Sequence, residues 1–476
     1  MMSEFPIKKL EGIVERVCVG YVGTCNKDYT ESGIGVPMIR TTNLTGTAIN
    51  YEQMKFISNE FHEKNIKSQL KRGDILVARH GDSGLPSIYE SDEEANCLNV
   101  VIVKLTINDD LIDNYYILYA LKSPFVVHQI KSAVGGSVQG VVNTKAIAGL
   151  DIPFPKRCVR EEVVQHLFNI DKKIELNRQT NQTLEQIAQA IFKSWFVDFE
   201  PVKAKIKAKQ EWVKSMTAKD GGNDESAEVN FVELAAMCAI SGKTEEQLKG
   251  LDEATLQQLK TTAALFPDAL LESELGEVPE EWELGELKAI AEFSIVRVDT
   301  SELTLENYIS TENMLEGKNG VSIASSLPAV KTVPRFEPNQ ILISNIRPYF
   351  MKIWLARFNG GRSNDVLGIE AKKPESVEYL YNLLYQDVFF NFMMMTSKGA
   401  KMPRGDKEAI MGWVCVQPSS AIKKAYSVVV RHFYEIIDSN NKENGSLEKI
   451  RDALLPQLLS GEIDLSENEI ISEVYA

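Results

Sequence analysis

The sequence predicts a mixed α+β fold in which two β-rich domains are separated by two long helices that pair as an antiparallel coiled coil. Three observations predict this architecture. The two halves of the 476-residue chain resemble each other at a shift of about 263–270 residues, each half contains short β-rich runs, and each half ends in a long helix with heptad periodicity. The sequence therefore indicates a pseudo-two-fold internal repeat.

The repeat is visible in matching segments of the two halves. Ile39 corresponds to Ile309, and Asn43 corresponds to Asn313. Segments that recur in the same order indicate two copies of one structural unit. The matching pairs are PMIRTTNLTG (37–46) with NYISTENMLEG (307–317), GDILVARHG (73–81) with NQILISNIR (339–347), and GGSVQGVVNTKAI (135–147) with GAKMPRGDKEAI (399–410).

Each copy begins with a β-rich domain. Short apolar and β-branched runs, broken by Gly, Pro, Asn and Asp, predict strands. Helical patterns follow these strands at 115–130 and 377–395. The strand runs are DILVA (74–78), LNVVIVKL (98–105), QILIS (340–344) and KIWLA (352–356).

The two long helices carry the strongest periodicity in the chain. Their seam positions alternate by four and three residues, as in the a/d pattern of a coiled coil. The first seam is Val163, Leu167, Ile170, Ile174, Asn177, Asn181, Leu184, Ala188, Ile191 and Trp195. The second seam, 263 residues later, is Tyr426, Val430, Phe433, Ile437, Asn440, Asn444, Leu447, Arg451, Leu454 and Leu458.

Both seams place two asparagines at the same steps: Asn177 and Asn181, then Asn440 and Asn444. A buried seam asparagine lowers stability but fixes register, so we expect these four residues to set the register of a mutual coiled coil. The alternative is two amphipathic helices that pack only on their own domains. Pro456 predicts a kink or an end in the second helix.

The domain boundaries follow from these patterns. We predict a first domain at 1–155, a first helix at 156–200, a connector at 201–275, a second domain at 276–418, a second helix at 419–465 and a C-terminal tail at 466–476. The KDGGNDESAE stretch (219–228) of the connector predicts a flexible loop.

The net charge of −15 at first argues against nucleic acid as a partner. However, residues 216–286 hold 17 acidic and 4 basic residues, a local net of −13, and the rest of the chain nets only −2. Because the acidity is local, the flanking domains are free to carry basic faces.

The cysteines and the N-terminus indicate a cytoplasmic protein. The six cysteines form no C-x-x-C pair, which predicts neither a disulfide framework nor a zinc site. The N-terminal MMSEFPIKKLEG lacks the apolar core of a signal peptide, and no apolar run reaches the roughly 20 residues of a membrane span.

Enzyme signatures do not hold. SGKT (241–244) resembles the end of a phosphate-binding loop, but Met237 stands where that motif needs glycine, so a helix cap at Ser241 or Thr244 is favoured. Asp299 and Glu316 have a nuclease-like spacing, although the glutamate falls in a Gly-rich turn. We therefore expect no catalytic residue and no metal site in this chain.

Four further stretches carry a family resemblance: DIPFP (151–155), KSWFVDFEPVKAK (193–205), LFPDALLESELGEVPEEWELGEL (265–287) and ALLPQLLSGEIDL (453–465). With them, essentially the whole chain resembles the specificity subunit of type I restriction–modification systems. In that family two variable target-recognition domains alternate with two conserved helical regions. The connector departs from the family because it is longer than usual between 206 and 262.

The resemblance implies a non-catalytic subunit that reads a bipartite, asymmetric site on double-stranded DNA. Two methyltransferase subunits, which use S-adenosylmethionine, would bind it, as would two restriction subunits, which use ATP and Mg. It implies no cofactor in this chain and no membrane association. One competing hypothesis is a regulatory or structural relative that binds the methyltransferase without reading a fixed sequence. The other is an enzyme with a nuclease centre around Asp299 and Glu316.

DNA contacts are expected in loops beside the matched strands, because Arg and Lys suit guanine and phosphate, and Asn and Gln suit adenine. The candidates in the first domain are Arg40, Thr41, Thr42, Arg79, His80, Ser83, Ser137 and Gln139. Those in the second domain are Ser310, Asn345, Arg347, Tyr349, Arg362, Asn364, Lys401 and Arg404. Subunit docking is expected on the exposed side of 160–198 and 424–459 and at Trp195 and Phe196, for which core packing is the alternative.

Overall fold

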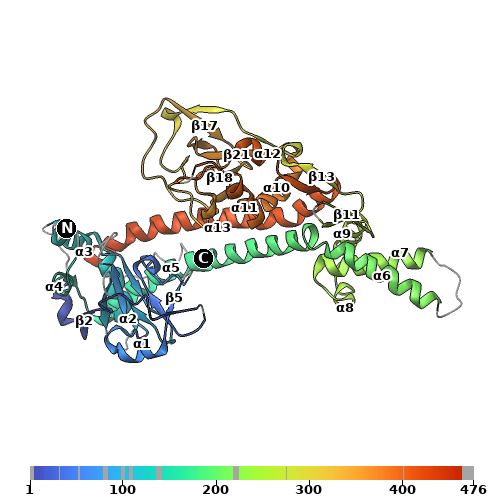
Figure 1. Ribbon diagram of the computed structural model, residues 1–476. Helices are drawn as coiled ribbons and strands as arrows, with labels where there is room; N and C mark the ends of the chain where they lie inside the picture. Colours follow the sequence, from blue (N-terminus) through green and yellow to red (C-terminus); the bar gives the residue numbers. More distant parts are fainter. Residues whose placement is uncertain are drawn as a thin grey trace. The chain divides into compact units, whose positions relative to one another are not determined.

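The computed structural model describes residues 5–31, 33–51, 54–78, 84–97, 102–106, 111–135, 142–217, 225–274, 276–399 and 401–463 (Figure 1). The chain divides into two compact units. Unit 1 comprises residues 1–178 and 441–476, and unit 2 comprises residues 179–440. Each unit thus combines one β-rich domain with part of each long helix, and the predicted α+β class is confirmed.

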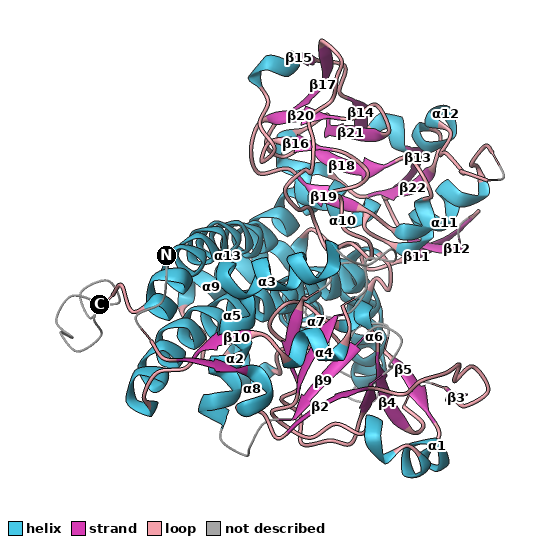
Figure 2. Ribbon diagram, turned by 90° about the vertical axis from the view of Figure 1, so that its left-hand side faces the viewer, coloured by secondary structure: helices cyan, strands magenta, loops and turns pink. Residues whose placement is uncertain are grey.

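Unit 1 contains two four-stranded sheets and a strand pair (Figure 2). The first sheet has the order β2 (Arg16–Val19), β9 (Ile102–Thr106), β6 (Ile75–Ala78) and β7 (Pro86–Ile88). The second has the order β3 (Tyr29–Thr30), β5 (Lys55–Ile57), β4 (Val36–Ile39) and β8 (Asn96–Cys97). Strand β1 (Ile7–Lys9) pairs with β10 (Asp151–Pro153), and the domain's helices are α1 (Asn59–Lys64), α2 (Leu111–Lys122), α3 (Pro124–Gly135) and α4 (Thr144–Ala148).

Unit 2 repeats this arrangement. One sheet has the order β14 (Ala291–Phe293), β21 (Val366–Ala371), β18 (Ile341–Ser344) and β19 (Ile353–Leu355). The other has the order β15 (Arg297–Asp299), β17 (Thr332–Phe336), β20 (Gly360–Arg362) and β16 (Tyr308–Ile309). Strand β13 (Glu283–Glu286) pairs with β22 (Val414–Gln417), β11 (Leu270–Ser273) pairs with β12 (Gly276–Pro279), and the helices are α10 (Val377–Leu384), α11 (Asp387–Met395) and α12 (Lys407–Met411).

The repeat extends to single hydrogen bonds. Tyr116 Oη donates to Pro153 O at 2.8 Å, and Tyr379 Oη, 263 residues later, donates to Val416 O at 2.7 Å. Both domains also contain one parallel strand pair, β4 with β8 and β16 with β20. The antiparallel partner of this parallel pair joins it on different strands. In unit 1, β5 pairs with β4, whereas in unit 2, β17 pairs with β20, the equivalent of β8.

The two long helices are α5 (Arg157–Phe196) and α13 (Ser420–Ser460). In unit 1 the buried Val163 and Leu167 of α5 share a core with Leu455 and Leu458 of α13. In unit 2 helices α10 and α11 lie between strand β18 and helix α13 (Figure 1), and Phe192 of α5 packs in the same core. Burial of these seam residues holds the helices together within each unit.

The seam asparagines pair as the heptads predict. Asn177 Nδ2 donates to Asn444 Oδ1 at 2.9 Å in unit 1, and Asn440 Nδ2 donates to Asn181 Oδ1 at 2.8 Å in unit 2. In both units, rising residue numbers on α5 meet falling numbers on α13, so the antiparallel pairing is confirmed. These amide pairs satisfy one another at the seam, and a shift of register would separate them.

The structure contradicts two expectations about the long helices. The end of the second helix expected at Pro456 is absent, because α13 continues to Ser460 and the neighbouring Leu455, Leu458 and Leu459 are buried in the core of unit 1. The kink, the other form of that expectation, stays a prediction. Trp195 and Phe196 do not form a docking surface. They are 1% and 6% exposed in the core of unit 2, where Trp195 meets the ring of Phe266 edge-on with the centroids 5.3 Å apart.

The connector is mainly helical. It forms α6 (Glu200–Thr217), α7 (Glu225–Ser241), α8 (Glu245–Leu248) and α9 (Glu253–Ala264). Helices α7, α8 and α9 enclose a small core around Ala236, Met237, Leu248 and Ala263. The prediction of a loop at 219–228 is wrong for 225–228, which begin α7, and its remainder lies outside the described residues. Thr244 caps α8 by accepting from Gln247 N, as the capping interpretation of SGKT predicts.

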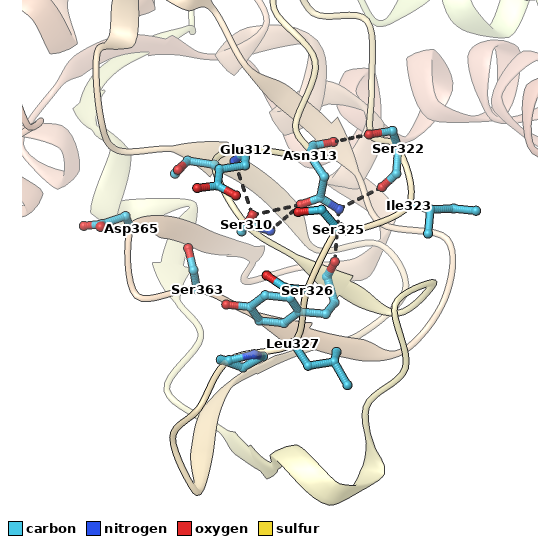
Figure 3. Close-up of a pocket in the computed structure, with 13 residues that line it drawn as sticks. Ser310, Glu312, Asn313, Ser322, Ile323, Ser325, Ser326, Leu327, Ser363 and Asp365 are labelled. Carbon is cyan, nitrogen blue, oxygen red and sulfur yellow. Dashed lines mark hydrogen bonds between the residues drawn. The ribbon is translucent and has the colours of Figure 1, made fainter. Parts of the chain in front are cut away.

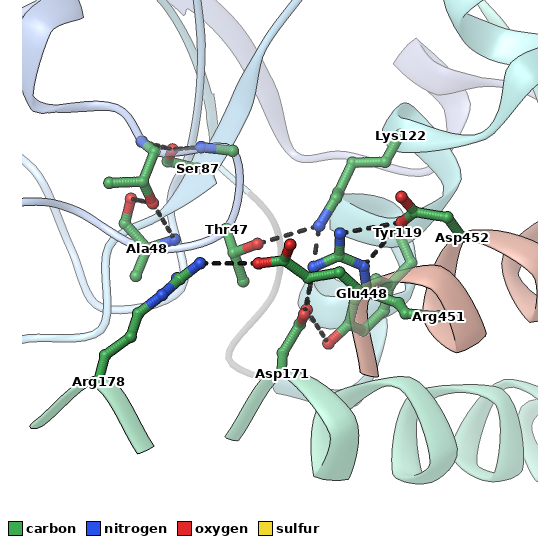
Figure 4. Close-up of polar contacts among 12 residues, drawn as sticks. Thr47, Ala48, Ser87, Tyr119, Lys122, Asp171, Arg178, Glu448, Arg451 and Asp452 are labelled. Carbon is green, nitrogen blue, oxygen red and sulfur yellow. Dashed lines mark hydrogen bonds and ion pairs between the residues drawn. The ribbon is translucent and has the colours of Figure 1, made fainter. Parts of the chain in front are cut away.

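A polar network fixes the first domain to the helices of unit 1 (Figure 4). Asp171 of α5 accepts from Tyr119 of α2 at 3.1 Å and forms an ion pair with Arg451 of α13 at 2.8 Å. Lys122 Nζ lies 3.9 Å from Asp171 and donates to Thr47 Oγ1 at 3.0 Å. Burial lowers the pKa of Lys122 because the charged amine loses contact with water. The carboxylate of Asp171 is therefore the shared counter-charge of Lys122 and Arg451.

Candidate nucleic-acid interface

Three loops of the second domain meet at one place. They are residues 345–351 after β18, residues 363–365 between β20 and β21, and residues 396–399 and 401–406 before α12. Asn345 N donates to Asp365 O at 2.8 Å, and Arg347 N donates to Pro403 O at 2.8 Å. These main-chain bonds bring together residues that are up to about 60 positions apart in the sequence. We call this place the three-loop junction.

Arg347 begins the first of these loops in a left-handed conformation, with φ 49° and ψ 64°. Such a conformation is uncommon for a residue other than glycine and persists where its surroundings hold it. The bonds Arg347 N to Pro403 O and Phe350 N to Arg347 O hold it here. Its half-buried side chain makes no hydrogen bond or ion pair with any residue that the structure describes, so the guanidinium is available to a ligand.

The other loops add exposed polar groups. Arg404, in the loop before α12, forms an ion pair with Asp365, with Nη2 3.1 Å from Oδ1 and 3.2 Å from Oδ2. Lys401 and Asn364 are exposed. Tyr349 is 49% exposed, and its ring lies 4.6 Å, centroid to centroid, from that of Phe350. Five predicted contacts therefore lie at the three-loop junction: Arg347, Tyr349, Asn364, Lys401 and Arg404.

A polar pocket of about 480 Å³ adjoins the junction (Figure 3). Its walls carry many hydroxyl groups, including those of Ser310 and Ser363, and Asp365 belongs to both the pocket and the junction. The Ser363 amide donates to Ile309 O at 2.9 Å, which ties this wall to β16. Ser310, predicted from its place after β16, therefore lines this pocket.

Buried asparagines hold the loop that contains Ser310 and its counterpart in the first domain. Asn313 Oδ1 accepts from Ser310 N at 2.6 Å, and Asn43 Oδ1 accepts from Arg40 N at 3.0 Å. Asn313 Nδ2 also donates to Ser322 O, and Asn43 Nδ2 to Asn50 O. The matched asparagines therefore hold the turn in both domains. The three residues before them differ: they are RTT at 40–42 and STE at 310–312.

Two predicted contacts are buried. Arg362 is 5% exposed in β20 and donates to Val366 O and Ser294 O, while burial lowers the pKa of its guanidinium to about 10. A guanidinium held between main-chain carbonyls inside the domain does not reach DNA, so the prediction for Arg362 is wrong. Asn345 is 7% exposed, and the described contribution of this residue is its main-chain bonds to Asp365 and Gly405.

In the first domain the structure places only part of the predicted set. Arg40 and Thr41 are half-buried and Thr42 is exposed, at and within the 3₁₀ turn Thr41–Asn43. The remaining candidates lie outside the described residues: Arg79, His80, Ser83, Ser137 and Gln139.

The catalytic alternative finds no support in the site chemistry. Asp299 caps a 3₁₀ turn, and hydrogen bonds from Ser301 lower the pKa of its carboxyl. Glu316 is exposed in a turn. Among the described residues, no group of three or more His, Cys, Asp or Glu side chains is arranged to hold a metal ion.

Comparison with known proteins identifies the setting of this interface. Residues 2–186 match the type I restriction modification DNA specificity domain. The chain is 27% identical over 419 residues to the HindI specificity subunit of Haemophilus influenzae, covering 83% of this chain and 88% of that protein. It is 23% identical over 486 residues to the MjaIX specificity subunit of Methanocaldococcus jannaschii, covering 98% of this chain and 95% of that protein.

These matches support the assignment of the chain as a specificity subunit of type I restriction–modification systems. A solved structure of the S subunit from M. genitalium is 15% identical, with a TM-score of 0.46, and the alignment covers 96% of both chains. Specificity subunits are non-catalytic and carry no cofactor, and the matches support a role of this chain in DNA recognition. None of the described helices is long and apolar enough to cross a membrane.

Sequence reasoning missed Asp365. It lies 39 positions before its partner Arg404 and follows no strand that the repeat identifies, so no sequence pattern joins the two residues. The one available signal was the matched pair Asn43 and Asn313, which marks the support of the neighbouring loop.

Proposed function

We propose that this specificity subunit reads a bipartite, asymmetric sequence on double-stranded DNA, with one half-site for each domain. The observation that carries the proposal is the three-loop junction, where Arg347, Lys401 and Arg404 bring three cationic side chains together beside a polar pocket. Arginine and lysine are the usual partners of phosphate and guanine, so this surface suits DNA despite the net negative charge of the chain.

Two different half-sites follow from the loop residues. The turn supported by Asn43 carries Arg40, Thr41 and Thr42, whereas the turn supported by Asn313 carries Ser310, Thr311 and Glu312. A cation at one position and a carboxylate nearby at the other favour different base edges. The two turns thus share a backbone arrangement but present different side chains, which favours a DNA target with two different half-sites.

We also propose that the chain positions two methyltransferase subunits and, where the host has them, two restriction subunits. The exposed sides of α5 and α13 carry the same apolar groups at equivalent positions. Ile187 and Ile450, 263 residues apart, are each 40% exposed, and the exposed Ala190 and Ala453 follow them by one helical step. A surface that occurs twice suits two copies of one partner.

The test of docking is subunit stoichiometry. Ile187→Asp and Ile450→Asp should each remove one methyltransferase copy from the complex in native mass spectrometry, and the double variant should remove both. Leu176→Asp, at a 57% exposed position of α5 whose equivalent is Ser439, is the matched control and should retain both copies. Two bound copies in the double variant would refute docking at these isoleucines.

The helix pair is proposed to set the spacing between half-sites. An inserted heptad adds about two turns, roughly 10 Å, to a helix. Seven residues inserted after both Arg178 and Asn440 keep the a/d pattern and both asparagine pairs. We expect the gap in the methylated motif to lengthen, and an unchanged gap would refute this role.

The deciding experiment is a single-molecule methylation map after co-expression with the methyltransferase in a host without DNA methylation. We expect a split motif with two different half-sites and a fixed gap. Methylation of the same motif by the methyltransferase alone would refute the proposed function.

A further inference from the structure

We propose that Asp365 is a positioning residue that holds Arg404 in the orientation needed to read a G·C pair in the second half-site. This inference rests on the proposed function and adds the residue pair and the base pair that it recognises. Nothing in the sequence pattern assigns Asp365 a role.

The contact geometry constrains Arg404 through a single nitrogen. Nη2 lies 3.1 Å from Oδ1 and 3.2 Å from Oδ2 of Asp365, so it sits between the two carboxylate oxygens. Within the described part of the chain, nothing bonds Nη1 or Nε of Arg404. The arginine side chain is 54% exposed and the aspartate side chain 36% exposed, so the pair lies at the surface.

The main chain fixes both partners. Arg404 N and O bond Lys398 O and N at 3.0 and 2.9 Å. Asp365 O accepts from Asn345 N, at the end of the buried strand β18. Each residue of the pair is therefore anchored at its backbone, and the ion pair adds the restraint on the long side chain of Arg404.

Arginine reads guanine by placing two N–H donors on O6 and N7. A long side chain loses rotamer freedom when it does so, and a carboxylate that already fixes the guanidinium reduces that loss. Asp365 contacts Nη2 and leaves Nη1 and Nε of Arg404 as donors for the base. The side chains of Arg347 and Lys401 have no such partner among the described residues, which suits contacts with phosphate.

Stability alone does not explain the pair. Surface ion pairs contribute little to folding because water screens them and both side chains lose entropy. Arg335 and Glu337 on and beside β17 form another such pair, with Nη2 and Oε1 3.2 Å apart and side chains 38% and 54% exposed. That pair provides a matched control in the same domain.

The test uses the intact complex and a DNA library randomised across the second half-site, with the methylation rate measured for each base at each position. The wild-type complex should require G·C at one position that Arg404→Lys relaxes by about tenfold or more. Asp365→Asn should relax the same position, with other positions and the thermal stability unchanged. Glu337→Gln should leave the preference intact.

Three results would overturn the inference. The first is equal slowing of methylation on all sequences by Arg404→Lys, which identifies a phosphate anchor. The second is an Asp365→Asn variant that keeps the full guanine preference that Arg404→Lys loses, which shows that Arg404 needs no positioning. The third is a wild-type half-site without a G·C pair that either variant affects. Failure of the proposed function is separate, because the wild-type complex would then give no split motif.

Discussion

In both units the domain contacts its long helix through side chains at equivalent positions. The kind of contact differs between the units: an aromatic pair in one stands where the other has an ion pair. In unit 1, Tyr115 meets Phe168 ring to ring at 4.8 Å. In unit 2 the equivalent residues, 263 positions later, are Glu378 and Arg431, which form an ion pair at 2.7 Å. One turn along the helix the exchange reverses.

At that next position unit 1 has an ion pair and unit 2 has hydrogen bonds from a tyrosine, to Asn382 and, at 3.5 Å, to Glu185. Asp171 of unit 1 binds Tyr119 and Arg451, whereas the equivalent Tyr434 donates to Asn382 at 3.0 Å. A domain attached to the other helix would set Glu378 against Phe168, which leaves a buried carboxylate without a cation. The difference teaches that the repeat conserves shape while its polar pairs assign each domain to its own helix.

The largest expected effect comes from removing the anion of unit 1. Asp171→Asn leaves Lys122 and Arg451 largely buried without their shared carboxylate, and should lower the free energy of unfolding of unit 1 by about 3–5 kcal/mol. Tyr434→Phe, at the equivalent position of unit 2, should cost about 1 kcal/mol. Hydrogen–deuterium exchange of each unit in the intact chain measures both. Asp452→Asn, the exposed second partner of Arg451, is the control, and equal losses at 171 and 434 would contradict the comparison.

The next effect tests whether the pairs are interchangeable. Arg431→Ala leaves the Glu378 carboxylate, 6% exposed, without its cation and should destabilise unit 2 by about 2 kcal/mol. The double variant Glu378→Tyr with Arg431→Phe installs the pair of unit 1 and should lie within about 1 kcal/mol of the wild type. A double variant as unstable as the single one would show that the backbones differ at this position.

A pH-dependent effect is expected in unit 2. Burial raises the pKa of Glu185 from 4.5 to about 7. The folded state therefore holds more protons than the unfolded state between these values, so stability falls as pH rises through this window. Glu185→Gln should stabilise unit 2 by about 2 kcal/mol more at pH 8 than at pH 5. Unfolding followed at both pH values checks this, and an equal gain at pH 5 would contradict it.

The smallest effect lies on the surface of unit 1. Arg178 and Glu448 form an exposed pair at 2.9 Å, and Arg178→Ala should cost less than about 0.5 kcal/mol. The loss should vanish at high salt because screening weakens exposed pairs. A loss above 2 kcal/mol that persists in salt would place this pair with the Asp171 network.

The sequence predicts the repeated architecture well because periodicity reports burial directly. The two seams identify α5 and α13, and the matched asparagines identify their register, since only paired amides are tolerated at such positions. The strands at 75–78 and 341–344 follow from their apolar runs. These features depend on local composition and on the heptad, which a single chain displays.

The remaining features depend on three-dimensional neighbours. Arg362 is interior because β20 turns its side chain toward the carbonyls of Val366 and Ser294, and no sequence pattern gives that direction. Trp195 belongs to the core because the rings of Phe196, Phe266 and Tyr426 surround it. Helix α7 was not predicted because the segment is acidic and polar at its start, although its AAMCAI stretch packs around Ala236. The role of Asp365 depends on contacts with Asn345 and Arg404 from two other loops, which the sequence does not show.

The division of unit 1 between both ends of the chain has a consequence for biosynthesis. Leu455, Leu458 and Leu459 complete the core of unit 1, yet they follow all of unit 2 in the sequence. At roughly 5–20 residues per second, the ribosome needs on the order of 10–50 s to make residues 179–440. The first domain thus waits with an unfinished core while the second can close. Newly made chains should therefore depend on chaperones at the first domain, and a premature stop before residue 441 should yield one folded unit.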